Sequence, residues 1–136
     1  MAALERELFS WLLAQTGLTP GTQAAGARPA GQLFRGPYPP EGPDECAALL
    51  WRGGTDADPT EVARPRFQVL VRGRTQDQAH VLLLKVLGAL ASNYAHDLGD
   101  HDLYASKAES VGYIGQDQKG RYEYSANFRL ATDRVL

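Results

Sequence analysis

The strongest constraint on the fold is an alternation of apolar and polar residues near the carboxyl end of the chain. Between residues 121 and 132, one parity carries Tyr122, Tyr124, Ala126, Phe128 and Leu130. The other parity carries Arg121, Glu123, Ser125, Asn127 and Arg129. Side chains of a strand point alternately to its two faces, so this pattern predicts a strand with one buried face and one polar face.

A turn signal stands directly before this strand. Asp117 at the first position and Gly120 at the last fit a type I turn, with Gly120 in the left-handed conformation that other residues resist. An earlier apolar run contains Val111, Tyr113 and Ile114. Residues 108–136 are therefore predicted to form a β-hairpin. A hairpin alone cannot bury its apolar face, so the rest of the chain must cover it.

Two helices are predicted to supply that cover. Residues 2–15 carry apolar side chains at helical spacing, with Gly17 as the stop: Leu4, Leu8, Trp11 and Leu12. Residues 75–94 begin with Thr75 and Gln78, which match a capping box. The apolar arc of this second helix is wider than the ~100° typical for a helix on one core. Its surplus predicts a further contact, either under a long loop or with another subunit.

The remaining segments complete a sheet. Short strands are expected at residues 32–35 and 46–51, the latter ended by Gly53-Gly54, and a longer one at residues 66–74. Residues 17–44 are rich in Gly and Pro and are predicted to form a long loop or arm. The expected fold is α+β: a mainly antiparallel sheet with a C-terminal β-hairpin, covered on one face by two helices. Residues 1–136 are expected to form a single domain.

Composition excludes several classes of protein. The net charge of −2 gives no overall attraction to nucleic acid or to an anionic membrane. The single cysteine, Cys46, excludes an internal disulfide and is interpreted as a small core residue. No apolar run is long enough to span a bilayer, and Glu5-Arg6-Glu7 stands where a secretory signal would be apolar. We expect no membrane partner.

One cluster of side chains invites a metal hypothesis. Its members lie in a short stretch after the second helix: His96, Asp97, Asp100, His101 and Asp102. The helical His-Glu-x-x-His arrangement is absent because Gly99 interrupts the segment, and a polar turn explains the same residues. No nucleophile signature with a recognisable base occurs. We therefore expect no enzyme, no metal and no cofactor, and keep a metal-dependent hydrolase as an alternative.

Arginines recur on the polar parity of the strand expected at residues 66–74. Arg64, Arg66, Arg72 and Arg74 share this parity with Gln68 and Leu70. Such a stripe is able to meet phosphate, as in a nucleic-acid-binding module, or an acidic partner surface. The alternative interpretation is a solvated face balanced by nearby Asp and Glu residues.

Three segments resemble those of the phage minor capsid and tail terminator family. They are Cys46-Ala-Ala-Leu-Leu-Trp-Arg-Gly-Gly54, Phe67-Gln-Val-Leu-Val-Arg-Gly73 and Ile114-Gly-Gln-Asp-Gln-Lys-Gly-Arg-Tyr-Glu-Tyr-Ser-Ala-Asn-Phe128. The resemblance runs from about residue 33 onward. Its most specific part is Asp117…Gly120-Arg121-Tyr122…Asn127-Phe128.

The resemblance implies a structural role. Such proteins form a ring, commonly a hexamer, at the head-proximal end of the tail tube, where they stop tube polymerisation and provide the surface for head docking. The implied partners are copies of the chain itself, the tail tube protein, a head connector or completion protein, and viral DNA that passes through the lumen without sequence-specific binding. The implied location is the virion tail, after assembly in the host cytoplasm. A head-completion or connector component is the alternative.

A ring needs a contact whose rotation closes on itself. The chain offers a hairpin edge, a long loop and a wide apolar helix for this purpose. We hypothesise that polar residues around the hairpin serve an interface or the lumen: Arg72, Arg74, Asp117, Lys119, Arg121, Glu123, Asn127 and Arg129. The alternative is an exposed sheet face with short-range ion pairs.

Overall fold

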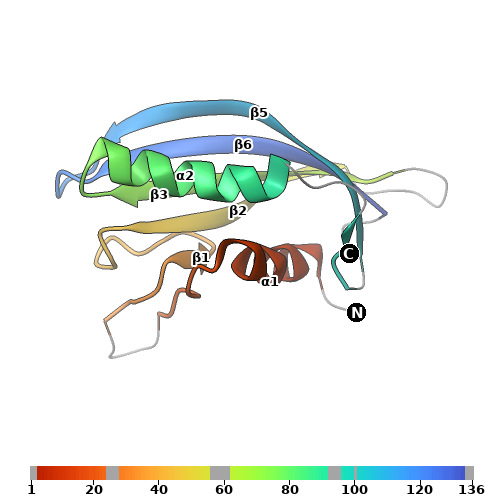
Figure 1. The fold of residues 1–136 in the computed structure, drawn as a ribbon, viewed down its shortest axis with the longest axis horizontal. Coiled ribbons are helices and arrows are strands. Elements are labelled where there is room, and N and C mark those ends of the chain that lie inside the picture. The colour runs from red at the N-terminus through yellow and green to blue at the C-terminus, as the bar shows by residue number, and fades with distance from the viewer. Residues whose placement is uncertain (1–2, 24–27, 56–61, 92–95, 100, 134–136) are drawn as a thin grey trace.

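The computed structural model describes residues 3–23, 28–55, 62–91, 96–99 and 101–133. The elements follow in the order α1 (Leu4–Thr16), β1 (Leu33–Arg35), β2 (Cys46–Thr55), β3 (Arg64–Gly73), α2 (Gln76–Ala91), β4 (His96–Asp97), β5 (Asp102–Gln116) and β6 (Tyr122–Thr132) (Figure 1). The strands form one six-stranded sheet in the order β1-β2-β3-β6-β5-β4. Strands β1 and β2 run parallel and the other neighbouring strands antiparallel, so the sheet is mainly antiparallel and contains the β5–β6 hairpin, as predicted.

Strands β3 and β6 form the centre of the sheet. Phe67 lies opposite Phe128 and Val69 opposite Ala126, so both apolar parities face the same side. The two phenyl rings stack with centroids 6.0 Å apart. The register thus places every apolar residue of the predicted alternation on one face, and the exposed fractions of Ala126, Phe128 and Leu130 are at most 1%.

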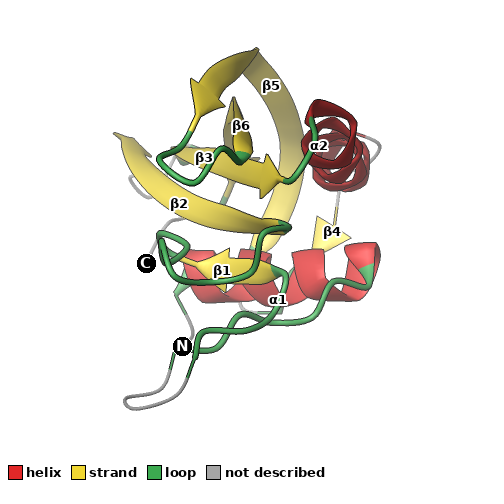
Figure 2. Ribbon diagram, turned by 90° about the vertical axis from the view of Figure 1, so that its left-hand side faces the viewer, coloured by secondary structure: helices red, strands yellow, loops and turns green. Residues whose placement is uncertain are grey.

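Both helices lie on that face, as predicted. Helix α2 runs along β3, β6 and β5, and α1 packs against α2 and β1 (Figure 2). The buried core joins helix and sheet residues, among them Leu4, Leu8, Leu12, Leu33, Leu49, Phe67, Val69, Val71, Leu83, Val86, Leu90, Leu103, Phe128 and Leu130. The two amphipathic helices thereby remove from water the face that a hairpin alone leaves open.

Local signals set the ends of the helices. Helix α1 ends at Thr16, and Gly17 follows with φ 71° and donates its N–H to the Leu13 carbonyl at 2.9 Å. The Thr75 hydroxyl accepts the Gln78 N–H at 3.1 Å, as a capping residue does. The Gln78 side chain returns to the Arg74 N–H at 2.7 Å, one residue earlier than a capping box requires.

The hairpin turn has the predicted chemistry. Gly120 has φ 78° and donates its N–H to the Asp117 carbonyl at 3.0 Å. The Asp117 carboxylate also accepts the N–H groups of Lys119 and Arg121, each at 2.9 Å. These bonds fix the turn and the register of the two strands that it joins.

Some predicted boundaries are wrong. Strand β2 does not stop at Gly53-Gly54 but continues to Thr55 through a bulge. A Cβ at Gly54 would meet the Arg64 carbonyl at 2.3 Å, so this glycine allows close approach between strands. Strand β4 was not expected, and the predicted helix residues 92–94 lie outside the described residues.

Adjacent leucines on α2 give a matched test of this packing. Leu83 is fully buried, whereas Leu84 is 54% exposed. We expect Leu83→Ala to lower the free energy of unfolding by about 2–5 kcal/mol, because it leaves a cavity in the core. We expect Leu84→Ala to change it by less than about 0.5 kcal/mol. Urea unfolding of both variants, followed by circular dichroism, measures the difference. Equal destabilisation would contradict the packing described.

Candidate assembly surfaces

The sheet face opposite the helices divides into two parts, and a loop covers one of them. We call residues 36–45, which contain four prolines, the proline loop. The loop lies over Arg72 of β3, which is 1% exposed although the sequence predicted a place in an exposed stripe. The Arg72 guanidinium donates to the carbonyls of Pro39 and Pro43 at 2.8–3.0 Å and lies 4.5 Å from the centroid of the Tyr38 ring. Arg72 is therefore a structural residue of the fold.

A second buried arginine joins the proline loop to the hairpin turn. Arg121 is 5% exposed, and its Nε donates to the Asp117 carboxylate at 2.8 Å. Its terminal nitrogens reach the carbonyls of Pro40 at 2.8 Å and Gly42 at 3.4 Å. Asp44 contributes a further carboxylate oxygen at 3.6 Å. A buried cation is tolerated only when its donors are satisfied, and here the loop and the turn do so together.

Three outer contacts surround these arginines. The Lys119 ammonium pairs with Glu41 at 3.1 Å, and the Arg74 guanidinium pairs with Asp44 at 2.8 Å. The Tyr38 hydroxyl donates to Glu123 at 3.1 Å. We use the name clasp for one unit. It consists of the proline loop, the hairpin turn, and the ends of β3 and β6 that this loop and turn join. A hollow of about 380 Å³ lies within it, lined by residues such as Tyr38, Glu41, Lys119 and Glu123.

The clasp favours the ionised forms of Asp117 and Asp44. Burial alone would raise the pKa of Asp117, but hydrogen bonds from the Arg121 N–H, the Arg121 guanidinium and the Lys119 N–H outweigh burial and lower it. A hydrogen bond from Arg74 lowers the pKa of Asp44. Burial, followed by the nearby Glu123, raises the pKa of Tyr38, so the phenol remains a donor. Burial raises the pKa of Cys46 to about 11, as suits the small core residue predicted.

The structure brings together six of the eight predicted interface residues in the clasp: Arg72, Arg74, Asp117, Lys119, Arg121 and Glu123. Each makes a contact within the chain. Asp117 contacts residues of its own turn, whereas the other five contact the proline loop, which sequence reasoning missed because that loop is distant in sequence. Asn127 and Arg129 lie elsewhere, along β6. Asn127 donates to the Ser110 hydroxyl at 2.8 Å, and Arg129 meets Glu109 at 3.4 Å. A role of these eight residues in an interface stays a prediction.

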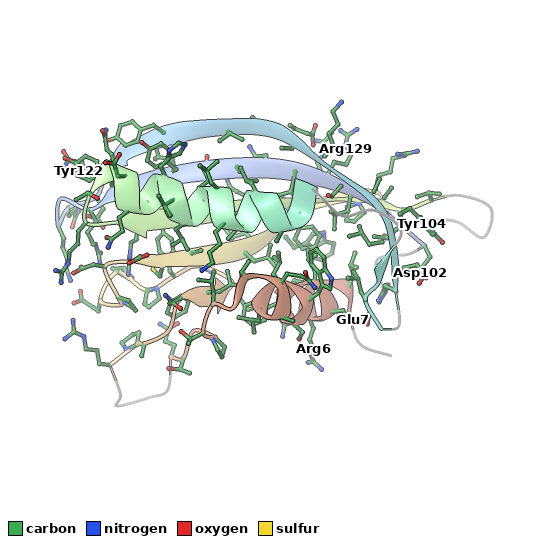
Figure 3. The ribbon with its side chains drawn as sticks, in the orientation of Figure 1. Arg6, Glu7, Asp102, Tyr104, Tyr122 and Arg129 are labelled. Atoms are coloured by element: carbon green, nitrogen blue, oxygen red, sulfur yellow. The ribbon has the colours of Figure 1, made fainter. Side chains whose placement is uncertain are left out.

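The uncovered part of this face is basic. We call Arg52, Arg64, Arg66, Lys107 and Arg129 the basic patch; they come from strands β2, β3, β5 and β6. Arg66 and Lys107 each lie opposite Arg129 in the register, and a hollow of about 450 Å³ is lined by Gly54, Arg64, Arg66 and Arg129. Arg129 lies at the opposite end of the molecule from Tyr122 (Figure 3). The predicted arginine stripe is therefore split between the clasp and this patch.

Strand β5 presents a long open edge. It pairs with β6 on one side, and β4 pairs with Asp102 and Leu103 on the other. Within the described part of the chain, no strand pairs with the outer side of residues 104–116. Residues 110–116 of this edge, Ser-Val-Gly-Tyr-Ile-Gly-Gln, carry no charge. Val111, Tyr113 and Ile114 are 47–55% exposed, so this edge offers both backbone hydrogen bonds and apolar surface.

Helix α2 extends this apolar surface. The ring centroids of His80 and Tyr124 lie 5.8 Å apart, and those of Tyr124 and Tyr113 of β5 lie 5.1 Å apart. Leu84 lies one helical turn beyond His80, on the same side of α2, and is 54% exposed. The wide apolar arc of this helix is therefore only partly buried within the chain. Of the two contacts expected for this surplus, the described part of the long loop does not cover Leu84, and the proline loop lies on the other face of the sheet.

Of the five residues in the metal hypothesis, the structure describes the side chains of His101 and Asp102, and His101 has a structural role. The His101 ring lies fully buried, with Nδ1 3.1 Å from a carboxylate oxygen of Glu7 in α1. The same carboxylate accepts the His101 N–H at 2.9 Å, so this pair fastens α1 to the start of β5. Asp102 is exposed (Figure 3). Side chains of His96, Asp97 and Asp100 lie outside the described residues. Among those described, no cluster of three or more His, Cys, Asp or Glu side chains is arranged to hold a metal.

Asp117 gives a test of the clasp. We expect Asp117→Asn to lower the free energy of unfolding at neutral pH by about 1–3 kcal/mol, because Arg121 loses a carboxylate partner while still buried. The pKa of Asp117 is lowered by folding, so its contribution is complete above the usual aspartate pKa of about 3.9 and is lost as the pH falls through the folded value. The difference between wild type and variant should therefore shrink in acid.

Urea unfolding between neutral and acidic pH measures this difference. Asp102→Asn is the matched control, because Asp102 is an exposed carboxyl outside the clasp. A gap that stays constant down to the acid limit, or an equal effect of Asp102→Asn, would refute the stabilising role of the Asp117–Arg121 pair.

Comparison with known proteins shows the family and the fold of this chain. The sequence model of the family described as bacteriophage tail terminator protein matches residues 13–134. A chain in the solved structure "Virion of native gene transfer agent (GTA) particle" has the same fold, with a TM-score of 0.66 and 16% sequence identity over 96% of this chain and 94% of that chain. No curated protein sequence matches, and none of the described helices has the length and apolarity to span a membrane. The chain belongs to the bacteriophage tail terminator family, whose members are structural proteins of the phage tail and not enzymes.

Proposed function

We propose that this protein closes into a ring, with a hexamer as the expected state, at the head-proximal end of the phage tail tube. There it stops polymerisation of the tube and presents the surface on which the filled head docks, while DNA passes through the lumen. The family membership supports a tail protein, and the solved neighbour belongs to a gene transfer agent virion. The proposed place is therefore the assembled tail, reached from the host cytoplasm.

The observation that carries the ring is the uncharged open edge of β5. Sheet edges in soluble proteins are usually protected by charges, and Lys107 and Glu109 give such protection to the first half of β5. Residues 110–116 lack it and also expose Val111, Tyr113 and Ile114. A second copy of the chain that adds backbone to this edge satisfies its free hydrogen-bonding groups and covers its apolar side chains.

A ring further requires that the two contacting surfaces differ. If β5 paired with β5 of a neighbour, the two edges would satisfy each other and assembly would stop at a dimer. We therefore propose that the β5 edge meets a different surface of the next copy. The clasp, at the hairpin end of each subunit, then remains free to meet the tail tube or the head connector. Lys119, Glu41 and Arg74 are among its exposed charged members.

Charges placed on the β5 edge test the ring. We expect Val111→Lys to reduce or abolish the oligomer, because a lysine would be forced into the apolar contact. Val62→Lys is the matched control, since Val62 is an exposed valine next to β3. Light scattering coupled to size exclusion, over a concentration series, gives the subunit number. A variant that still forms the wild-type oligomer, or a wild type that stays monomeric even with purified tail tubes, would exclude β5 as the ring contact.

Tail length tests the termination role. When the protein is absent from an assembling phage, we expect tubes that exceed the normal length, because nothing caps the growing end. Electron microscopy of lysates measures the length distribution, and wild-type protein supplied from a plasmid should restore the normal length. Tubes of normal, fixed length without the protein would refute termination. Binding to filled heads instead of free tails would favour the head-completion alternative.

A further inference from the structure

We propose that the basic patch binds the phosphodiester backbone of nucleic acid without reading its sequence. The inference deepens the proposed function, and it rests on that function in taking the nucleic acid to be the DNA that passes through the ring. The patch consists of four arginines and one lysine on the uncovered half of the sheet, whereas the whole chain carries a net charge of −2. The positive charge is therefore local and does not reflect the composition of the chain.

The strand register makes this group of cations destabilising to the sheet when no ligand is bound. Arg129 lies directly opposite Arg66 on one side and directly opposite Lys107 on the other. Like charges in such cross-strand positions destabilise a sheet. Glu109 relieves the repulsion only in part, at 3.4 Å from Arg129 and 3.9 Å from Arg66. A stretch of sheet that keeps mutually repelling cations is a candidate for binding an anion.

The contrast with the clasp indicates which arginines are available. Arg72 and Arg121 are buried and held by backbone carbonyls, so they have no capacity left for a ligand. The Arg66 side chain is 53% exposed and that of Arg129 is 38% exposed, and both line the hollow of about 450 Å³ together with Arg64 and Gly54. Arg52 donates to the Gln68 side chain at 2.6 Å and lies beside them.

The chemistry favours phosphate over protein carboxylates. Guanidinium groups match two oxygens of a phosphate, and a nucleic acid duplex carries about one charge per 1.7 Å of its axis. Four strands that supply cations form an array that a densely charged backbone is able to follow, whereas acidic side chains rarely cluster so closely. Among the described residues that line the hollow, none is aromatic, so the patch offers no platform on which bases stack. Binding should therefore be made through the backbone and be independent of sequence.

A binding assay on the full chain tests the proposal. The probe is a short fluorescent DNA duplex, prepared in two unrelated sequences, and anisotropy is recorded as potassium chloride rises. We expect wild type to bind both duplexes equally, with an affinity that falls as salt rises. The triple variant Arg64→Gln, Arg66→Gln, Arg129→Gln should reduce the slope of log affinity against log salt by about 2.7, or about 0.9 for each phosphate that is no longer neutralised. Arg129→Gln alone should reduce it by about 0.9.

The control variant is Arg6→Gln, Arg28→Gln, Lys85→Gln, which removes the same charge at three exposed positions outside the patch. It should retain wild-type binding, and circular dichroism checks the fold of every variant. An equal reduction in the control, no binding by wild type at low salt, or equal competition by polyglutamate at matched charge would overturn the proposal. The last outcome would assign the patch to an acidic protein. If the protein binds DNA but forms no ring, the proposed ring alone is refuted. If it forms a ring but does not bind DNA, this inference alone is refuted.

Discussion

The antiparallel pairing of β3 with β6 is the constraint on which the rest of this structure depends. It aligns the apolar parities of both strands on one side, where Phe67 and Phe128 stack, and leaves the mainly polar parities on the opposite side. Once one face is fixed as apolar, two amphipathic helices must cover it, because exposure of that many large side chains would oppose folding. The polar face does not have to be covered for the chain to fold, so different segments of it are free to take different roles.

That freedom explains the divided use of arginine. At the hairpin end, the proline loop covers the sheet and places several carbonyl oxygens around Arg72 and Arg121. Proline has no N–H, so a proline-rich loop presents more acceptors than donors and suits a buried guanidinium. At the other end no described loop covers Arg66 and Arg129, and their charges remain in contact with solvent. The same residue type on the same face is structural at one end and available to a ligand at the other.

This division also shows what the sequence was able to predict. Alternation and helical spacing predicted the hairpin, both helices and the buried face, because these patterns are set by local geometry. They did not predict that Arg72 is buried, since its partner Pro43 in the proline loop lies 29 residues earlier in the chain and carries no periodic signal. The Glu7–His101 pair was missed for the same reason, because it joins α1 to β5 across most of the chain. The eight residues predicted to meet a partner were chosen for polarity, and polarity alone does not distinguish a side chain that meets its own chain from one that meets another.

The open edge of β5 is a feature that contacts within a single chain do not explain. The charged pair Lys107 and Glu109 would protect a strand that must stay single. The half that follows carries no charge, and its one register shift lies between Tyr113 and Gly115. A soluble chain that exposed Val111, Tyr113 and Ile114 permanently would risk uncontrolled edge-to-edge association. The risk is acceptable if the edge is covered as soon as copies meet on the tube, and if the clasp keeps the β5–β6 hairpin in one register until then. In this view the buried arginines fix the hairpin so that the edge is ready for its partner, which links the interior of the clasp to the assembly of the proposed ring.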